Sequence, residues 1–562
     1  MTASSAFPPA LVLILGGLLL PLLRGYARSV AILALPLLTV WLVWQLPDGV
    51  SLSARFLEYR LEVVKADALG RLFATIFAIM AFAGGLFALN QRRVAELAAA
   101  SVYAGSAVGV ALAGDLITLF VFWEIMAITS TLVVWSRGSE NSYRASMRYL
   151  QVHLFGGVLL MAGIVAQVTD TGTIAFTAMT PDTPGTWLML AGFLINAGAP
   201  PLSAWLPDAY PEASYSGTVF LSAFTTKAAV YVLLRGFPGA EILIYVGLYM
   251  MLYGIVYALL ENDMRRILAY SIVNQVGFMV TGIGIGTEMA LNGAAAHAFT
   301  HIIYKALLLM SAGSVLYMTG KSKCSDLGGL FQSMPLTTAC GIIGALSISS
   351  FPLTSGFISK SMISQGAVDE RLAVTWFLLA AGTAGVFLHA GIKFPWFVFF
   401  QKDSGLRPPD PPLNMRLAMI LFSILCIGLG VWPQPLYALL PYPVEYAPYT
   451  VPHVVNMLQL LLFSGLAFFT MLPLMQRTLT ITLDFDWFYR TLGKWVLGPA
   501  ATLTSKALSG AEKEARTWIG VFIGFVFRHH GPQGALARSL QAGSMAFWMI
   551  VLLGAYLVLY LI

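Results

Sequence analysis

Long apolar runs recur along almost the whole chain, and they constrain its fold more than any other feature. Each run approaches the ~20 residues that an α-helix needs to cross a bilayer. Of the 562 residues, 58% are hydrophobic and only 10% are charged, whereas about 25% charged residues are usual in soluble domains. We therefore predict an all-α polytopic membrane protein. About sixteen spans are expected, near residues 9–24, 29–46, 68–88, 94–113, 115–134, 148–168, 186–205, 212–234, 241–261, 266–285, 290–318, 333–350, 372–400, 414–434, 456–475 and 544–562.

The basic residues of the loops predict the orientation. They fall mostly in alternate loops, at residues 24–28, 92–93, 137–148, 265–266, 321–323 and 402–407. By the positive-inside rule these loops face the cytoplasm of a bacterial-type inner membrane, which leaves the N-terminus outside. The mixed-charge segment 47–67 is expected outside as a loop or hairpin. Because no basic face with interleaved aromatic residues is present, the net charge of +6 does not indicate a nucleic-acid partner.

Composition divides the chain into three parts. Residues 1–67 are expected to form N-terminal spans and the external segment, and the first span is expected to be retained rather than cleaved. Residues 68–435 form the core, in which the stretch 351–366, rich in Pro, Gly and Ser, is expected to be half of a broken helix. Residues 436–562 form an extension, with either an amphipathic surface helix or a loop before a last span.

Two ionisable residues lie deep in apolar runs, where a charge costs about 2.5–3.5 kcal/mol. Glu124 follows the apolar run that ends in Trp123, and Lys227 lies in the middle of its run. Each either takes part in proton exchange or forms a polar contact between helices. The functional interpretation is favoured, since such residues are rarely retained without a role.

Further titratable residues stand at helical spacing. His297, His301 and Lys305 are four residues apart, so they share one helix face and can form a proton relay. A zinc site lacks a further ligand in the motif, and a polar helix contact is the other alternative. Lys360, on the expected broken helix, either faces a hydrated cavity or reaches the interface. His153 is expected to be a packed or interfacial histidine.

Metal and cofactor chemistry is not predicted. The three cysteines are far apart, at positions 324, 340 and 426, and no metal or redox spacing is present. No nucleotide-binding or nucleophile motif with the required strand and helix context is found. We therefore expect no metal, no cofactor and no active site for covalent chemistry in this chain.

Five segments together resemble the antiporter-like subunits that Mrp-type multisubunit Na+/H+ antiporters share with respiratory complex I. Among these subunits, the resemblance is greatest to the D subunit of the Mrp antiporters. The five segments are Asp115–Glu124, Pro201–Ala209, Asp263–Ser271, His297–Lys305 and Gly356–Lys360. The resemblance covers about residues 65–435 and implies a core of about fourteen helices, two of them broken. The stretch from Phe485 to Tyr489 resembles the tail of the larger members.

The resemblance also implies roles for the buried residues. Glu124 would be the switch acid, Lys227 the central lysine and Lys360 the terminal group. The relay would consist of His297, His301 and Lys305.

One position departs from the family pattern. The family lysine on the first broken helix stands nine residues before the Trp of the "WLPDA" segment, and here that position holds Asn196. Asparagine forms hydrogen bonds but carries neither a proton nor a charge. Glu124 then loses its usual partner unless another cation, such as Lys227, reaches it, and we expect altered gating of this half-channel.

The sequence thus predicts a subunit of a multisubunit cation/proton antiporter that moves H+, against Na+, beside other membrane subunits. Three alternatives stay open: a proton-pumping subunit of a complex I-like oxidoreductase, a scaffold subunit that has lost transport, and a subunit of an ion-coupled uptake complex. Asn196 is the feature that favours the scaffold.

Overall fold

The chain folds into two compact units, residues 1–485 and 486–562. The structure is a computed structural model that describes residues 7–474, 484, 487–531, 534 and 542–561. Within these residues, 13 helices are long and apolar enough to cross a membrane, which confirms the all-α polytopic class. Phe485 and Asp486, which belong to the stretch that resembles the family tail, lie outside the described residues.

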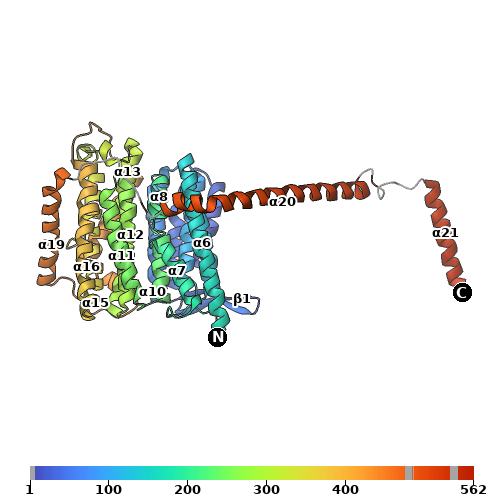
Figure 1. Ribbon diagram of the computed structural model, residues 1–562, viewed down its shortest axis with the longest axis horizontal. Helices are drawn as coiled ribbons and strands as arrows, with labels where there is room; N and C mark the ends of the chain where they lie inside the picture. Colours follow the sequence, from blue (N-terminus) through green and yellow to red (C-terminus); the bar gives the residue numbers. More distant parts are fainter. Residues whose placement is uncertain (1–6, 475–483, 485–486, 532–533, 535–541, 562) are drawn as a thin grey trace. The chain divides into compact units, whose positions relative to one another are not determined.

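The first unit is a bundle of helices with one short hairpin (Figure 1). Its elements are α1 (Pro9–Leu19), α2 (Gly25–Gln45), β1 (Gly49–Phe56), β2 (Tyr59–Ala66), α3 (Ala68–Phe87), α4 (Val94–Leu112), α5 (Leu116–Trp135), α6 (Glu140–Thr171), α7 (Pro184–Ala197), α8 (Trp205–Ala209), α9 (Gly217–Leu221), α10 (Thr225–Gly236), α11 (Ile242–Leu260), α12 (Met264–Ile285), α13 (Glu288–Thr319), α14 (Pro335–Ile348), α15 (Ser355–Asp369), α16 (Ala373–Val386), the π-helices η6 (Phe387–Lys393) and η7 (Trp396–Phe400), α17 (Leu413–Val431), α18 (Gln434–Tyr437) and α19 (Val451–Thr470).

The mixed-charge segment 47–67 is a hairpin rather than a loop. Strands β1 and β2 pair antiparallel, from Gly49 opposite Ala66 to Phe56 opposite Tyr59. Asp115 ties this hairpin to the bundle, because its carboxylate accepts from the Glu62 N–H at 2.7 Å and from the Thr118 N–H at 2.8 Å. The same side chain therefore caps α5 and holds the hairpin against its N-terminus.

Three breaks interrupt the helices at membrane depth. α7 ends at Ala197, short of the predicted span 186–205, because Gly198 adopts a φ of 83° and two prolines follow. The predicted span 212–234 is divided into α9 and α10 by residues 222–224. α14 and α15 are separated by residues 349–354, where Ser350 and Leu353 have positive φ, so 351–366 includes the start of a half-helix as predicted.

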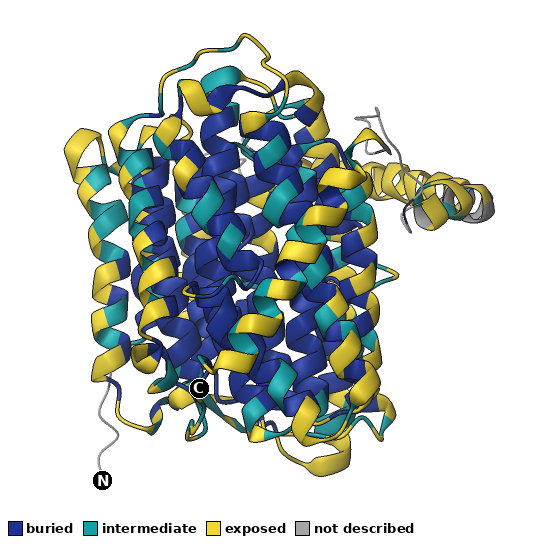
Figure 2. Cartoon of the chain, turned by 90° about the vertical axis from the view of Figure 1, so that its left-hand side faces the viewer, coloured by how far each residue is buried: buried dark blue, intermediate teal, exposed yellow. Residues whose placement is uncertain are grey.

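The centre of the bundle is formed by α12, α13 and the segment 217–236. Figure 2 shows buried residues filling the middle and exposed residues on the outer helices. The most apolar windows of α12 and of 217–236 are wholly buried, whereas α2 and α19 are mostly exposed. Titratable residues on the central helices are therefore shielded by the rest of the bundle.

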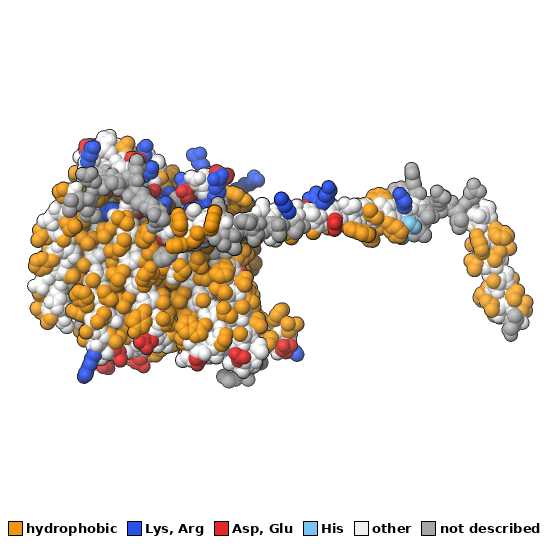
Figure 3. All heavy atoms as spheres, in the orientation of Figure 1, with side chains coloured by type: hydrophobic (Ala, Val, Ile, Leu, Met, Phe, Trp, Pro, Cys, Tyr) orange, Lys and Arg blue, Asp and Glu red, His pale blue; other side chains and the backbone are white. Residues whose placement is uncertain are grey.

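Charge is distributed unequally between the two ends of the bundle. On the visible face of the first unit, most Lys and Arg side chains lie at one end and the opposite end is richer in Asp and Glu (Figure 3). The apolar band between them is that expected of a protein surrounded by lipid.

The described residues of the second unit form two helices and a short π-helical turn, Phe488–Leu492. Helix α20 (Gly493–His530) has 38 residues, and α21 (Ala542–Leu561) has the length and hydropathy of a span. In α20, Trp518, Phe522 and Phe525 recur at helical spacing, and charged residues lie mostly on another side (Figure 3). The predicted amphipathic segment is thus helical.

Close packing of α11 on α12 generates a first prediction. A Cβ at Gly277 would lie 2.5 Å from the Gly247 carbonyl oxygen, so Gly277→Val should force the helices apart and cost about 1–3 kcal/mol. Thermal unfolding of the detergent-solubilised complex measures this loss. Gly428→Val on α17, which meets nothing within 4 Å, is the matched control and should unfold like the wild type. Equal stability of the two variants would contradict the described crossing.

Candidate functional site

Lys227 lies at the break between α9 and α10. Its ammonium donates to the Ser222 carbonyl at 2.6 Å and to the Thr226 hydroxyl at 3.1 Å, and its side chain is fully buried. Ser222 directly follows α9, so its carbonyl belongs to a helix C-terminus. Such ends carry a partial negative charge and unpaired carbonyls, which stabilise a cation.

Lys360 repeats this arrangement at another break. Its ammonium donates to the carbonyl of Ile348, the last residue of α14, at 2.7 Å. The ammonium also lies 4.8 Å from the centre of the Phe278 ring, a cation–π contact. The side chain is only 2% exposed, so the interface position considered for it is not the one it takes.

Lys393, which is outside the predicted set of site residues, is a third lysine whose ammonium binds carbonyls at a helix end. It ends η6, and its ammonium donates to three carbonyls at the end of α11: Ala258 at 3.0 Å, Leu259 at 2.6 Å and Glu261 at 2.5 Å. His389, one turn earlier, is also buried. Their four-residue spacing in the sequence places both on one helix face, which is consistent with either an extension of the relay or an interface role.

These three lysines share one electrostatic property. Within the described residues, none of them forms an ion pair with a carboxylate, and backbone carbonyls take that place instead. A carboxylate would hold the proton of a lysine through a full opposite charge, whereas a helix end supplies about half a charge. The arrangement therefore stabilises the cation with less than a full opposite charge.

His297 connects α13 to both of its neighbours. Its Nδ1 lies 3.0 Å from the Ser359 hydroxyl of α15, and its Nε2 lies 3.2 Å from Gln275 Oε1 of α12. Tyr304 contacts the same imidazole at 3.3 Å and donates to Gln275 at 3.1 Å. Ser359 precedes Lys360, so the histidine and the terminal lysine belong to one polar cluster.

His301 lies one turn further along α13 and is surrounded by the cations. The charges of Lys227, Lys305 and Lys360 all act on its ring. Neither ring nitrogen has a hydrogen-bond partner within the described part of the chain. Lys305 completes the row, donating to the Ser271 hydroxyl at 2.9 Å and to the Leu268 carbonyl at 3.3 Å. The structure thus brings together five of the predicted residues.

Glu124 is not joined to this group. Its side chain lies on α5, is half-buried, and its Oε1 has no hydrogen-bond partner among the residues described. No ion pair with Lys227 is found in that part of the chain. The space beside Gly157 of α6 holds the carboxyl, because a Cβ there would lie 2.1 Å from Oε1. Asn196, near the end of α7, contacts α6 as well.

A polar cavity of about 410 Å³ opens near the first residues of α12. Ion pairs at 3.2 Å line it, Arg137 with Glu212 and Arg266 with Glu261. The Glu261 carbonyl also accepts from Lys393. Lys393 therefore lies next to a charged cavity at the end of the bundle.

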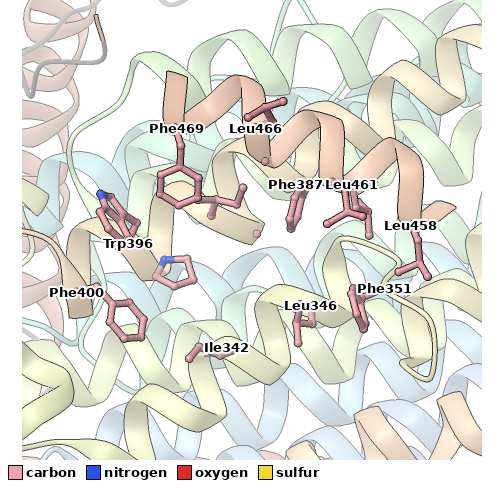
Figure 4. A pocket seen from close by; sticks show the side chains of 15 residues that line it. Ile342, Leu346, Phe351, Phe387, Trp396, Phe400, Leu458, Leu461, Leu466 and Phe469 are labelled. Atoms are coloured by element: carbon pink, nitrogen blue, oxygen red, sulfur yellow. The ribbon is translucent and has the colours of Figure 1, made fainter. Parts of the chain in front are cut away.

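A second cavity, of about 540 Å³, has the opposite character (Figure 4). It lies between α14, the π-helices and α19, and apolar side chains such as Leu346, Phe387 and Leu461 line it. None of its lining residues is titratable, so this cavity offers no step for a proton.

No group of three or more His, Cys, Asp or Glu that could hold a metal ion is found among the described residues. The two histidines that could have bound zinc have other neighbours. His297 contacts hydroxyl and amide groups, and His301 contacts aromatic rings.

Most of the site lies in a region that matches a known family, and of the buried lysines and histidines described above only His389 and Lys393 lie beyond it. Residues 113–388 match the family described as "NADH:quinone oxidoreductase/Mrp antiporter, TM". The chain is 30% identical over 350 residues to the D subunit of the Na(+)/H(+) antiporter of Alkalihalophilus pseudofirmus, covering 58% of this chain and 71% of that protein. It is equally 30% identical over 357 residues to the N subunit of the NADH-quinone oxidoreductase of Desulforudis audaxviator, covering 58% and 70%.

The fold is also similar to a solved structure. A chain in the structure of the Mrp complex from Dietzia sp. DQ12-45-1b superimposes with a TM-score of 0.69 at 21% identity. The match covers 82% of this chain and all of that one.

The contact between Lys360 and α14 predicts the sign of the change in stability when the lysine is replaced. Lys360→Met should lower stability by about 1–3 kcal/mol, because the Ile348 carbonyl is left buried without a donor. If the buried charge of Lys360 instead destabilised the fold, its replacement by methionine would raise the unfolding temperature. Thermal unfolding of the solubilised protein measures the sign, and exposed Lys321→Met should change nothing.

Proposed function

Because the chain belongs to the family of membrane subunits shared by NADH:quinone oxidoreductases and Mrp antiporters, we propose that it is a proton-translocating subunit of a multisubunit Na+/H+ antiporter. The observation that carries this proposal is the row of buried lysines and histidines, each cation held by neutral groups. Such groups can gain and lose protons without breaking an ion pair.

Protons move along this row by electrostatic coupling. Lys227, His301 and Lys305 form the central part, and His297 passes the proton through Ser359 toward Lys360. Two unit charges about 10 Å apart repel by about 1.7 kcal/mol at an effective dielectric constant of 20. Moving one charge through 100 mV exchanges about 2.3 kcal/mol, so repulsion between adjacent cations is of the size that transport requires.

Glu124 acts as the switch acid that controls this row. Its carboxyl gains and loses a proton at the α5–α6 contact, and the change of charge shifts the proton distribution on Lys227. The polar cavity beside Lys393 serves as the exit to the aqueous side with the basic loops. That side is the cytoplasm of a bacterial-type inner membrane, and the N-terminus lies outside.

A second function, proton pumping in an oxidoreductase, is supported by an equal sequence identity to another relative. The N subunit of an NADH-quinone oxidoreductase is as similar to this chain as the D subunit of the antiporter. In that assembly the same row would pump protons, driven by redox chemistry in other chains. Membrane subunits are the expected partners in both cases. Copurified Mrp-type subunits would support the antiporter, and iron–sulfur or quinone-binding subunits the oxidoreductase.

Glu124→Gln tests the transport function. The amide cannot release a proton, so proton uptake into vesicles that contain the assembled complex should fall at least about tenfold. The control is Glu241→Gln, since that glutamate precedes α11, outside the row, and accepts a hydrogen bond from the Tyr245 hydroxyl. Assembly is checked by copurification of the partner subunits. Unchanged proton uptake by assembled Glu124→Gln complexes would support the scaffold alternative and contradict transport by this chain.

A further inference from the structure

His153 lies in the middle of α6 and has no part in the path described above. Its side chain is fully buried, and Nδ1 lies 2.8 Å from Asn196 Oδ1. Nε2 has no hydrogen-bond partner within the described residues. A buried polar atom without a partner costs free energy. A packing role alone does not account for a histidine with one free nitrogen.

The same face of α6 carries the groups around Glu124. A Cβ at Gly157 would lie 2.1 Å from Glu124 Oε1, and one at Gly156 would lie 3.5 Å from Asn196 Oδ1. His153 precedes these glycines by three and four residues, which is one helix turn, or about 6 Å along the axis. The acid, the imidazole and the amide therefore gather on one helix face.

Each of these three side chains has an unsatisfied polar atom. Within the described part of the chain, Glu124 Oε1, His153 Nε2 and Asn196 Nδ2 are all buried without a partner. Three such atoms, one each from α5, α6 and α7, lie at one face of α6 and define a polar site in which water can bridge donors and acceptors.

A set of hydroxyls continues from this site toward Lys227. The ring of Tyr149 packs on that of His153, with centroids 4.1 Å apart. The Tyr149 hydroxyl lies 3.0 Å from that of Ser130 and 3.3 Å from that of Thr225. Thr225 is the first residue of α10 and stands two positions before Lys227. Polar groups thus connect the α6 face with the break that holds the central lysine.

We propose that His153 is the titratable group that replaces the lysine expected at position 196, and that Asn196 orients its imidazole. The protonated carboxyl of Glu124 releases its proton, through water, to Nε2, which leaves a carboxylate and an imidazolium. The imidazolium then releases this proton, by way of the hydroxyls of Tyr149 and Thr225, to the neutral amine of Lys227 and returns to the neutral form. A new proton on Glu124 restores the starting state.

This inference rests on the proposed function and changes the expected consequence of Asn196. An amide at position 196 removes a cation from α7, and the histidine one helix away restores a titratable group on α6. The half-channel therefore keeps two titratable groups, and the departure from the family pattern is a relocation rather than a loss.

The test compares His153→Gln with the double variant His153→Gln, Asn196→Lys in vesicles that contain the intact complex. Glutamine keeps a hydrogen bond to Asn196 but carries no proton, so proton uptake should fall at least about tenfold. Lysine at 196 returns a titratable group to α7, and the double variant should recover to within about threefold of the wild type. His529→Gln, on exposed α20, is the control and should transport normally.

Copurification of the partner subunits and thermal unfolding establish that each variant is folded and assembled. Normal uptake by His153→Gln would overturn the proposal, and so would a loss that Asn196→Lys does not restore, since both indicate a structural histidine. Glu124→Gln is measured in parallel. If that variant transports normally the proposed function itself fails, whereas a defect confined to Glu124→Gln contradicts only the role of His153.

Discussion

The lack of hydrogen-bonding solvent in the bilayer is the constraint on which the site depends. A buried ammonium and the carbonyls at a helix end both need partners there, and each supplies what the other lacks. Lys227 meets the end of α9, Lys360 the end of α14 and Lys393 the end of α11. Two of the three described helix breaks therefore hold a buried lysine, and at each of them the ammonium and the helix-end carbonyls satisfy one another.

Under the proposed function, this arrangement also accounts for protons that remain exchangeable inside a stable structure. An ion pair inside the bundle would fix the charge of both partners, since separating them in a low dielectric is costly. A helix end holds the lysine more weakly, and hydroxyl or amide groups hold His297. His301, without a hydrogen-bond partner in the described residues, lies under the influence of three cations.

Much of the fold and part of the site could be predicted from the sequence. Hydropathy located the spans, and the spacing of His297, His301 and Lys305 placed them on one face of α13. The break between α9 and α10 was missed, because residues 222–224 contain neither proline nor glycine and only the Lys227 contact marks it. The burial of His153 agrees with the expected packed or interfacial histidine, but its pairing with Asn196 joins positions 43 apart in the chain and could not be predicted. Such contacts depend on helix packing that no local pattern reveals.

The central claim is that protons pass between these buried titratable groups, several of which have polar atoms with no hydrogen-bond partner among the described residues, so that water has to bridge them. A cryo-EM map of the intact complex, at a resolution that shows ordered water, tests it most directly. The account predicts water within hydrogen-bonding distance of both ring nitrogens of His301 and between Glu124 and His153, continuing toward Lys227 and Lys360. Apolar side chains packed against these groups, with no water density between them, would contradict it.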